Sequence, residues 1–427
     1  MRRALATAAI AAMLLLSVTA VVSATGTQDT GTGPIKIGMY QDLSAGTAQW
    51  GTDSKKGAEL RIKEINAAGG LLGRQVQLIT YDCKGAPTES VKNYTRLVQE
   101  DKVVAVYGSL NSNTGLAVGP VAEQLKIAVV TRCMDERVTT PDFKPETPDN
   151  PGRVNPYVYV LQPSCYQQSA MIAGYAIDEL KFNSFAMLFT PSNAYSFMMA
   201  KGFEYYLAKR GKKLVGSFEF QAGDLDYRAQ LTKVKGLNPD ALFVPAYVTE
   251  NANAAKQAKE LGLKATLLGN NSWFEPLDQV AGEAADGAYF PLNISRDNPK
   301  LKWYIDKFEK EYGEKPRLHG FSGWDDMGFI LEAIKKAKST DPEKIRTAME
   351  EMKRYDGVIG DINMDPKTHR SYGLTMSIMK IAGKTFTTAE MAYYPKQVKY
   401  PDRRFRRAGQ LPRPLSIPAL RRRPGCH

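Results

Sequence analysis

Residues 103–114, V-V-A-V-Y-G-S-L-N-S-N-T, decide the fold class of this chain. A β-branched run that ends at Gly108 predicts a buried strand, and residues 115–125, G-L-A-V-G-P-V-A-E-Q-L, predict a helix. The turn of small polar residues between them places hydroxyl groups and free backbone N–H groups at the start of this helix. Such a turn suits a small anionic or dipolar ligand. The alternative is a plain strand–helix connection in which Ser112 or Asn113 caps the helix.

The alternation of strand and helix continues on both sides of this stretch. In the first half, strands are predicted at 35–40, 75–81, 103–107, 127–131 and 157–161, and helices at 51–68, 88–100 and 115–125. In the second half, strands are predicted at 184–189, 214–220, 241–245, 266–268 and 287–292, and helices at 168–180, 196–209, 227–235 and 249–261. Strands that alternate with helices form parallel sheets. The sequence therefore predicts an α/β protein with two doubly wound parallel-sheet lobes.

Two other segments depart from this alternation. Residues 141–156 contain five prolines with interleaved acids and are predicted to form a surface loop. Beyond the last parallel strand, helices are predicted at 299–312, 321–338 and 342–352, and an antiparallel hairpin at 374–381 and 389–394. Asp341 precedes the third of these helices and is expected to cap it.

The first 24 residues have the composition of a secretory signal peptide. Arg2 and Arg3 precede an apolar stretch at 4–22, and Val22-Ser23-Ala24 fits cleavage after the alanine. A flexible Gly- and Thr-rich spacer is predicted to follow at 25–33. A membrane anchor is the alternative, because the apolar stretch is nearly long enough to span a bilayer. We expect the signal peptide to direct export of the protein.

The formal net charge of +12 is concentrated near the chain ends. Residues 401–427 contain eight arginines against Asp402, a net charge of +7, and Arg2 with Arg3 contributes +2, which leaves +3 for the remainder. A nearly balanced body gives no reason to expect nucleic-acid binding. The segment 396–427 lacks an apolar period and is predicted to be a basic, disordered tail.

The four cysteines, at 83, 133, 165 and 426, do not have the spacing of a metal site. In an oxidising compartment, one disulfide is plausible. Cys83 and Cys133 both follow predicted strands at one end of a sheet, so they form the first candidate pair. Cys133–Cys165 is the second candidate. Neither a metal ion nor a cofactor is predicted.

Several short motifs along the chain resemble those of one family. They are A-Q-W-G at 48–51, G-A-E-L at 57–60, I-N-A-A-G-G at 65–70, the polar turn at 108–114, K-E-L-G at 259–262 and G-E-A-A-D-G at 282–287. From residue 34 to 395 the chain resembles the periplasmic branched-chain amino-acid-binding proteins, which are receptors of ABC importers with the type I periplasmic binding fold. The resemblance implies two lobes joined by a three-crossing hinge. Lobe I is expected at 34–161 plus 291–361, and lobe II at 162–290 plus 362–395.

The same resemblance implies a ligand site between the two lobes. Trp50 matches an aromatic residue that covers the ligand side chain. Ser112, next to Asn111, matches the hydroxyl group that receives the ligand α-carboxylate. Tyr195 and Tyr247 match aromatic residues of lobe II that close over the ligand.

Two positions depart from the family pattern and leave the ligand class open. Residues 131–137, T-R-C-M-D-E-R, stand where the family has a small Ala-Thr or Ala-Ser segment, which adds Met134 and Asp135 to the candidate site. Asp135 could supply an acid or Arg132 a cation, and a surface ion pair is the alternative for both. Asn271 stands where the family has the acid that pairs with the ligand ammonium, and an amide cannot form that ion pair. An aromatic, amide-bearing or cationic ligand would also suit the lining.

An enzyme is not predicted, because the chain lacks a G-x-S-x-G or H-E-x-x-H motif and contains only three histidines. The expected function is that of a periplasmic substrate-binding protein of an ABC importer. It would bind a small amino-acid-like or related polar ligand between two closing lobes, act as a monomer, and deliver the ligand to a permease in the inner membrane. A ligand-sensing receptor for a signalling partner is the main alternative, and an exported hydrolase is a weaker one.

Overall fold

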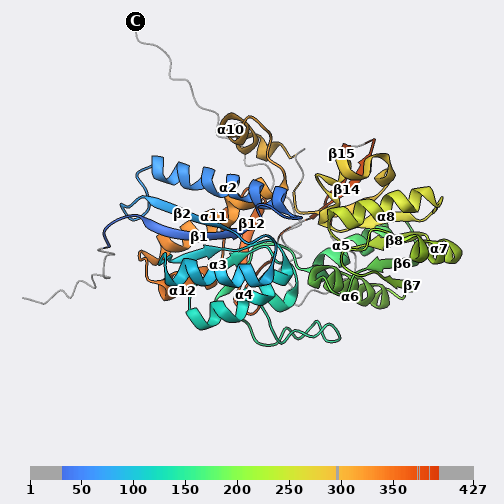
Figure 1. Cartoon of the computed structure of the whole chain (residues 1–427), viewed down its shortest axis with the longest axis horizontal. Coiled ribbons are helices and arrows are strands. Elements are labelled where there is room, and N and C mark those ends of the chain that lie inside the picture. The colour runs from blue at the N-terminus through green and yellow to red at the C-terminus, as the bar shows by residue number, and fades with distance from the viewer. Residues whose placement is uncertain (1–30, 295–297, 373, 375, 384, 394–427) are drawn as a thin grey trace, which may run out of the picture. The chain divides into compact units, whose positions relative to one another are not determined.

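The computed structural model describes residues 31–294, 298–372, 374, 376–383 and 385–393 (Figure 1). The predicted signal peptide, most of the predicted spacer, the predicted tail and Cys426 lie outside these residues. The described residues from Thr32 onward belong to one structural unit. They form two sheets, each flanked by helices, which confirms the predicted α/β class.

The first sheet has eight strands in the order β11-β12-β13-β5-β4-β3-β1-β2. Its strands are β1 (Ile35–Gln41), β2 (Val76–Asp82), β3 (Ala105–Tyr107), β4 (Val129–Thr131), β5 (Val158–Val160), β11 (Tyr355–Gly357), β12 (Gly360–Asp365) and β13 (Arg370–Tyr372). Strands β1 to β5 are parallel, as predicted. The antiparallel pairs β11–β12 and β12–β13 form an edge that the sequence did not predict. Glycines and acids interrupt the apolar pattern of this segment.

The second sheet has seven strands in the order β15-β14-β10-β9-β8-β6-β7. Its strands are β6 (Ser184–Phe189), β7 (Lys213–Glu219), β8 (Ala241–Val244), β9 (Thr266–Gly269), β10 (Tyr289–Leu292), β14 (Met376–Ala382) and β15 (Thr385–Tyr393). Strands β6 to β10 are parallel. The predicted terminal hairpin is confirmed, because β14 pairs antiparallel with both β15 and β10.

The chain passes between the two sheets three times, after β5, after β10 and after β13. This order confirms the three crossings that the family resemblance implies. Sheet membership moves two of the expected lobe boundaries. Residues 291–292 belong to β10 in the second sheet, and residues 362–365 and 370–372 belong to β12 and β13 in the first sheet. The third crossing falls later than expected because β13 pairs with β5 and keeps this segment in the first sheet.

The helices lie close to their predicted positions, with short additional turns. The α-helices are α2 (Ala48–Ala67), α3 (Pro87–Gln99), α4 (Ser112–Leu125), α5 (Cys165–Asp178), α6 (Ala194–Lys209), α7 (Arg228–Leu237), α8 (Val248–Glu260), α9 (Leu277–Ala281), α10 (Lys302–Tyr312), α11 (Leu318–Ala337) and α12 (Pro342–Glu350). The 3₁₀ helices are η1 (Glu136–Val138), η2 (Asn271–Trp273), η3 (Gly282–Ala285) and η4 (Pro299–Leu301). Asp341 caps α12 as predicted, since its carboxylate accepts the backbone N–H of Lys344 at 3.0 Å. Among the described residues, no helix combines the length and apolar composition needed to cross a bilayer.

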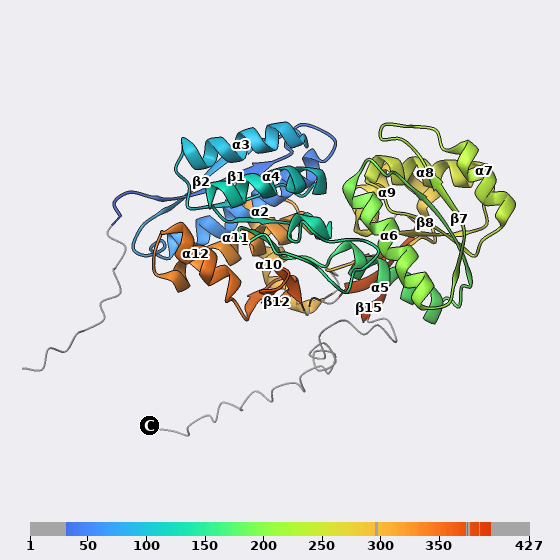
Figure 2. The same cartoon turned by 90° about the horizontal axis from the view of Figure 1, so that it is seen from below.

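Helices cover both faces of each sheet (Figure 2). In β4, Val129 packs with residues of α3 and α4, whereas Val130 packs with residues of α2, α11 and α12. In β6, Phe185 packs with residues of α5 and α6, whereas Ala186 packs with residues of α7 and α8. Successive strand residues thus face separate cores, as parallel sheets buried on both faces require.

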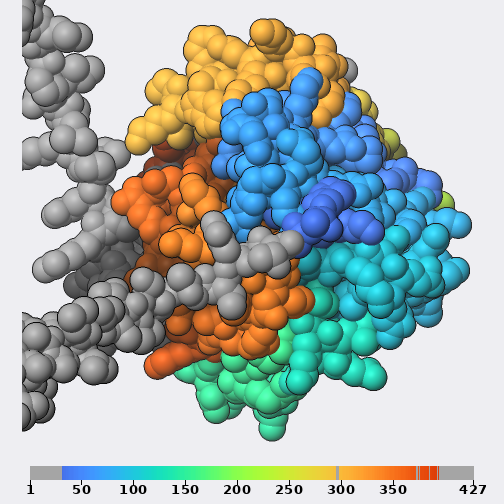
Figure 3. Space-filling view, turned by 90° about the vertical axis from the view of Figure 1, so that its left-hand side faces the viewer, coloured from blue at the N-terminus to red at the C-terminus, as the bar shows by residue number. Residues whose placement is uncertain are grey.

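Helices α2 and α11 approach closely because glycines stand at their contact. A Cβ atom added to Gly323 would lie 2.0 Å from the carbonyl oxygen of Ser54, so α11 has no room for a side chain there. Helix α10 runs beside α2 on the surface (Figure 3), where Lys63 pairs with Glu311 at 2.6 Å. This packing fixes the position of the first turns of α2 and α11.

The three described cysteines are free thiols, so neither expected disulfide pair forms. Each thiol is buried and has its own surroundings. The Cys133 Sγ donates to the carbonyl oxygen of Asn111 at 3.0 Å, and the Cys165 Sγ faces the carbonyl oxygen of Tyr195 at 3.9 Å. Burial raises the pKa of the Cys133 thiol to about 12 and also raises the pKa values of Cys83 and Cys165. These thiols are held protonated rather than paired.

Candidate functional site

A cavity lies among the loops that follow the carboxyl ends of strands in both sheets, where open parallel sheets place their ligands. Its enclosed volume is about 30 Å³, and the figure rises to about 540 Å³ when the space open to solvent is included. The lining residues are Trp50, Asp53, Leu110, Ser112, Arg132, Met134, Gln162, Tyr195, Tyr247, Asn271, Ser272, Phe274, Glu275, Arg317, Leu318 and His319. This set includes six of the eight predicted site residues.

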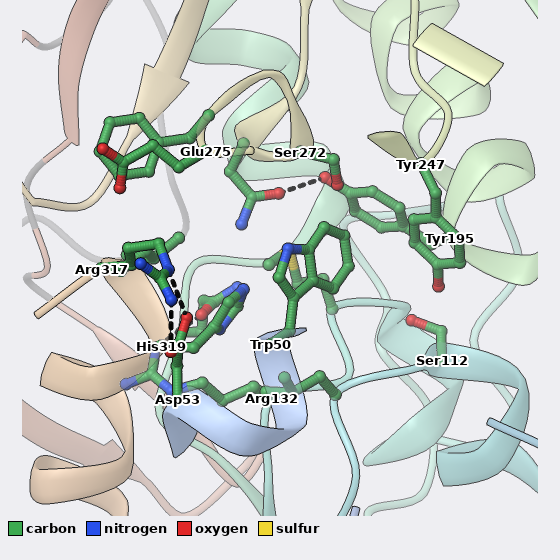
Figure 4. Close-up of a pocket in the computed structure, with 16 residues that line it drawn as sticks. Trp50, Asp53, Ser112, Arg132, Tyr195, Tyr247, Ser272, Glu275, Arg317 and His319 are labelled. Atoms are coloured by element: carbon green, nitrogen blue, oxygen red, sulfur yellow. Dashed lines mark hydrogen bonds and ion pairs between the residues drawn. The ribbon is translucent and has the colours of Figure 1, made fainter. Parts of the chain in front are cut away.

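Trp50 occupies the middle of the cavity, in the first turn of α2 (Figure 4). Its ring meets the ring of Tyr247 edge-on, with centroids 5.6 Å apart. On its other side it lies against the ring of His319, with centroids 5.1 Å apart. The indole therefore separates two ends of the cavity that differ in chemistry.

The first end, called the hydroxyl end, is formed by Ser112, Tyr195, Tyr247 and Asn271. Ser112 is the first residue of α4, and its Oγ accepts the backbone N–H of Asp135 at 3.4 Å. The rings of Tyr195 and Tyr247 stack with centroids 5.9 Å apart. The Tyr195 hydroxyl donates to the Asn271 Oδ1 at 2.6 Å. Lobe I thus supplies a hydroxyl group at a helix start, and lobe II supplies an aromatic wall.

The second end, called the charged end, is formed by Asp53, Arg132, Gln162, Arg317 and His319. The Arg317 Nε donates to the Asp53 Oδ2 at 3.0 Å. The Arg132 Nε donates to the Asp326 Oδ2 at 2.7 Å, beneath the cavity. The Arg132 Nη1 donates to the Gln162 Oε1 at 2.5 Å. Two ion pairs and an amide therefore hold this end in place.

Burial sets the protonation of the ionisable groups at the charged end. It lowers the pKa of His319 to about 3, and the nearby positive charge of Arg132 acts in the same direction. The imidazole is therefore neutral at physiological pH. Burial also raises the pKa of Asp53, while the guanidinium of Arg317 opposes that change.

Two predicted site residues, Asn111 and Asp135, do not line the cavity. Asn111 is the N-cap of α4, and its side chain accepts the backbone N–H of Asn113 at 2.9 Å. The sequence offered Ser112 or Asn113 as the cap of this helix, but the capping residue is Asn111. Asp135 is fully buried and accepts two hydrogen bonds from Arg137, at 3.0 and 2.6 Å. Its carboxylate is directed to this neighbour because it caps η1.

Most of the charged end was missed by sequence reasoning. Arg317 and His319 stand at the start of α11, which follows another helix and not a parallel strand. Asp53 lies three residues after Trp50, and this helical spacing was the one available signal that both share a face of α2. Arg132 was considered as a cation for a ligand carboxylate, and the structure places it at the cavity. Within the described part of the chain, no group of three or more His, Cys, Asp or Glu residues could hold a metal ion.

Two α/β sheets whose loops line one shared cavity define a two-lobed solute-binding protein. The family model described as "Periplasmic binding protein" matches residues 34–385. The chain therefore belongs to the periplasmic binding protein family, which comprises solute-binding proteins rather than enzymes. This confirms the resemblance seen in the sequence.

Relatives and solved structures agree with this assignment. A Leu/Ile/Val-binding protein homolog 7 of Brucella melitensis is 25% identical over 74% of this chain and 80% of its own length. The structure of LivJ from Streptococcus pneumoniae in complex with isoleucine has a TM-score of 0.75 and 27% identity, and covers 84% of this chain and 99% of that one. A solute-binding protein of Rhodopseudomonas palustris, in complex with 3,4-dihydroxybenzoic acid, has a TM-score of 0.73 and 22% identity, covering 85% and 97%.

Proposed function

We propose that the protein is the periplasmic substrate-binding component of an ABC importer, which binds a small amino-acid-like or related polar molecule in the cavity around Trp50. The observation that carries this proposal is one cavity lined by loops of both sheets. A ligand that contacts both lobes favours the conformation in which they are closed over it. Such a conformation is what a carrier needs in order to present a loaded state to its partner.

Contacts across the cavity support closure as the working motion. The Asn113 side chain, from the start of α4, accepts the backbone N–H of Ala194 at 2.9 Å. The same side chain donates to the carbonyl oxygen of Ser192 at 3.4 Å. One residue of lobe I therefore engages the turn that begins α6 in lobe II. Together with the Trp50–Tyr247 contact, these bonds stabilise a closed arrangement around a ligand.

The proposed partner is an ABC importer permease in the inner membrane, and the proposed working form is a monomer exported by the signal peptide at 1–24. Structures of the same fold hold isoleucine in one protein and 3,4-dihydroxybenzoic acid in another. The fold alone therefore leaves the class of ligand open.

A thermal-shift screen of the mature protein against amino acids, amides, polyamines and small aromatic acids tests the proposal. A compound present at about 100 times its Kd stabilises the folded state by about 2.7 kcal/mol, which gives a clear rise in Tm. We expect at least one class to produce this rise. If no compound raises the Tm at millimolar concentration, the proposed binding function is wrong.

A further inference from the structure

The charged end contains buried hydrogen-bond donors that have no partner among the described residues. The Arg132 side chain is 1% exposed, and its Nη2 bonds to nothing within the described residues. Gln162 is 2% exposed, and the same holds for its Nε2. Both residues line the cavity, and the Nη1–Oε1 bond joins their side chains. Burying a donor without a partner costs folding free energy. The two donor atoms, Arg132 Nη2 and Gln162 Nε2, are therefore suited to an acceptor that enters with a ligand.

The position of the Arg132 guanidinium is fixed independently of any ligand. Its Nε is bonded to the Asp326 carboxylate at 2.7 Å, and its Nη1 to Gln162. A guanidinium held in this way offers its remaining nitrogen in a set direction, which favours a planar anionic acceptor such as a carboxylate. His319 adds a ring nitrogen, Nδ1, that also lacks a partner among the described residues.

The carboxylates that line the cavity, Asp53 and Glu275, both lie near the Arg317 guanidinium. The Asp53 carboxylate is engaged by Arg317 and by the Gln49 amide at 3.0 Å. Glu275 lies close enough to Arg317 to act on its charge. The Asn271 Oδ1 already accepts the Tyr195 hydroxyl, so its amide presents a donor to a ligand. An α-ammonium would therefore meet donors, and the two lining carboxylates already face the positive charge of Arg317.

We infer that this cavity selects a small monocarboxylate with an aromatic or branched apolar body and no ammonium group, its carboxylate held by Arg132 and Gln162. This inference rests on the proposed function, because it names the ligand class of the same site. The apolar body lies against Trp50 and the aromatic wall of Tyr195 and Tyr247, whose faces suit a flat or branched group.

Matched probes on the wild-type protein test the inference by titration calorimetry. They are 3-phenylpropanoate, L-phenylalanine and 3-phenylpropanamide, with 4-methylpentanoate and L-leucine as a second set. We expect each acid to bind at least tenfold more tightly than its amino acid, and 3-phenylpropanoate at least tenfold more tightly than its amide. Tighter binding of either amino acid than of its acid overturns the inference and leaves the proposed function standing.

Two other outcomes of the same titrations would also contradict the inference. Equal binding of the amide and the acid overturns the role given to the charge of Arg132. If none of the five probes binds, the inference is wrong. The wider thermal-shift screen then shows separately whether the proposed function fails with it.

Two variants locate the effect within the cavity. Asn271→Asp adds an acid and is expected to strengthen L-phenylalanine binding at least fivefold while weakening 3-phenylpropanoate binding by a similar factor. Asn150→Asp, in an exposed loop, makes the same charge change and should alter neither affinity.

The double change R132M with D326N removes both members of the buried pair, so that no charge is left unpaired. It should weaken the acid at least tenfold and the amide by a much smaller factor, and retained selectivity for the acid would contradict the assignment.

Discussion

The two ends of the cavity are held in place in different ways. Ser112, Tyr195 and Tyr247 at the hydroxyl end each stand a few residues after a parallel strand. At the charged end Arg132 and Gln162 also follow parallel strands, β4 and β5, but Arg317 and His319 stand at the start of α11, which is positioned by packing against α2. A strand end fixes its residues through the sheet, whereas a helix start depends on a contact between segments far apart in the sequence. The charged end should therefore be more sensitive to distant substitutions.

The largest expected effect comes from Gly323→Ala, which tests how the charged end is held. The new Cβ would lie 2.0 Å from the Ser54 carbonyl oxygen, so α2 and α11 must separate. We expect the free energy of unfolding to fall by about 3 kcal/mol, measured by chemical denaturation. The control is Gly236→Ala in α7, where no atom lies within 4 Å of the added Cβ. This control should be neutral or stabilising, and equal losses in both variants would contradict the tight packing of α2 and α11.

The second largest expected effect is a pH dependence of the free energy of unfolding. It should arise from His319 at the charged end and not from the hydroxyl end. His319 is neutral in the folded protein because burial lowers its pKa to about 3, whereas in the unfolded chain its pKa is about 6.5. The unfolded state therefore binds the additional proton as the pH falls below about 6.5. The stability contributed by the neutral ring is complete above that pH and is lost below it, by about 2 kcal/mol between pH 6.5 and pH 5.

His319→Gln should remove this part of the pH dependence, measured as the slope of unfolding free energy against pH. Tyr247→Phe at the hydroxyl end should keep the wild-type slope, because burial raises the pKa of that tyrosine away from this range. An unchanged slope in His319→Gln would show that the imidazole is not held neutral.

The smallest of the three effects concerns the residue between the two ends. Trp50→Ala removes the ring that contacts both Tyr247 and His319. We expect the affinity for the tightest ligand of the screen to fall at least tenfold, about 1.4 kcal/mol, measured by titration calorimetry. Trp303→Ala is the control, since that tryptophan is 50% exposed on α10 and lies outside the cavity. Unaltered affinity in Trp50→Ala would remove this residue from the site.

The predictability of the fold follows from pattern length and residue type. Strands β1 to β10 are mostly β-branched or aromatic runs between helices, so the alternation was visible in the sequence. Strands β11 to β13 are short and contain Gly357 and Gly360, and they exist because β13 finds the edge of β5. Pairing with a distant edge leaves no local signal, which is why the third crossing was expected too early.

In the site, positions were more predictable than side-chain directions. Trp50, Ser112 and Tyr195 were found because a strand end and a family pattern both point to them. Asp135 was expected in the cavity but turns to Arg137, since a buried carboxylate goes to the strongest donor within reach. The sequence could not show that choice, because it depends on which side of η1 faces the core.

The buried thiols can also report which part of the protein opens locally. Alkylating reagents attack an accessible thiolate, and burial denies both access and ionisation to Cys133 and Cys165. Cys133 follows β4 in the first sheet, and Cys165 begins α5, which covers the second sheet. Modification of one thiol before the other therefore identifies the lobe that loosened first. The order in which the native thiols are labelled therefore ranks the local stabilities of the two lobes without an introduced probe.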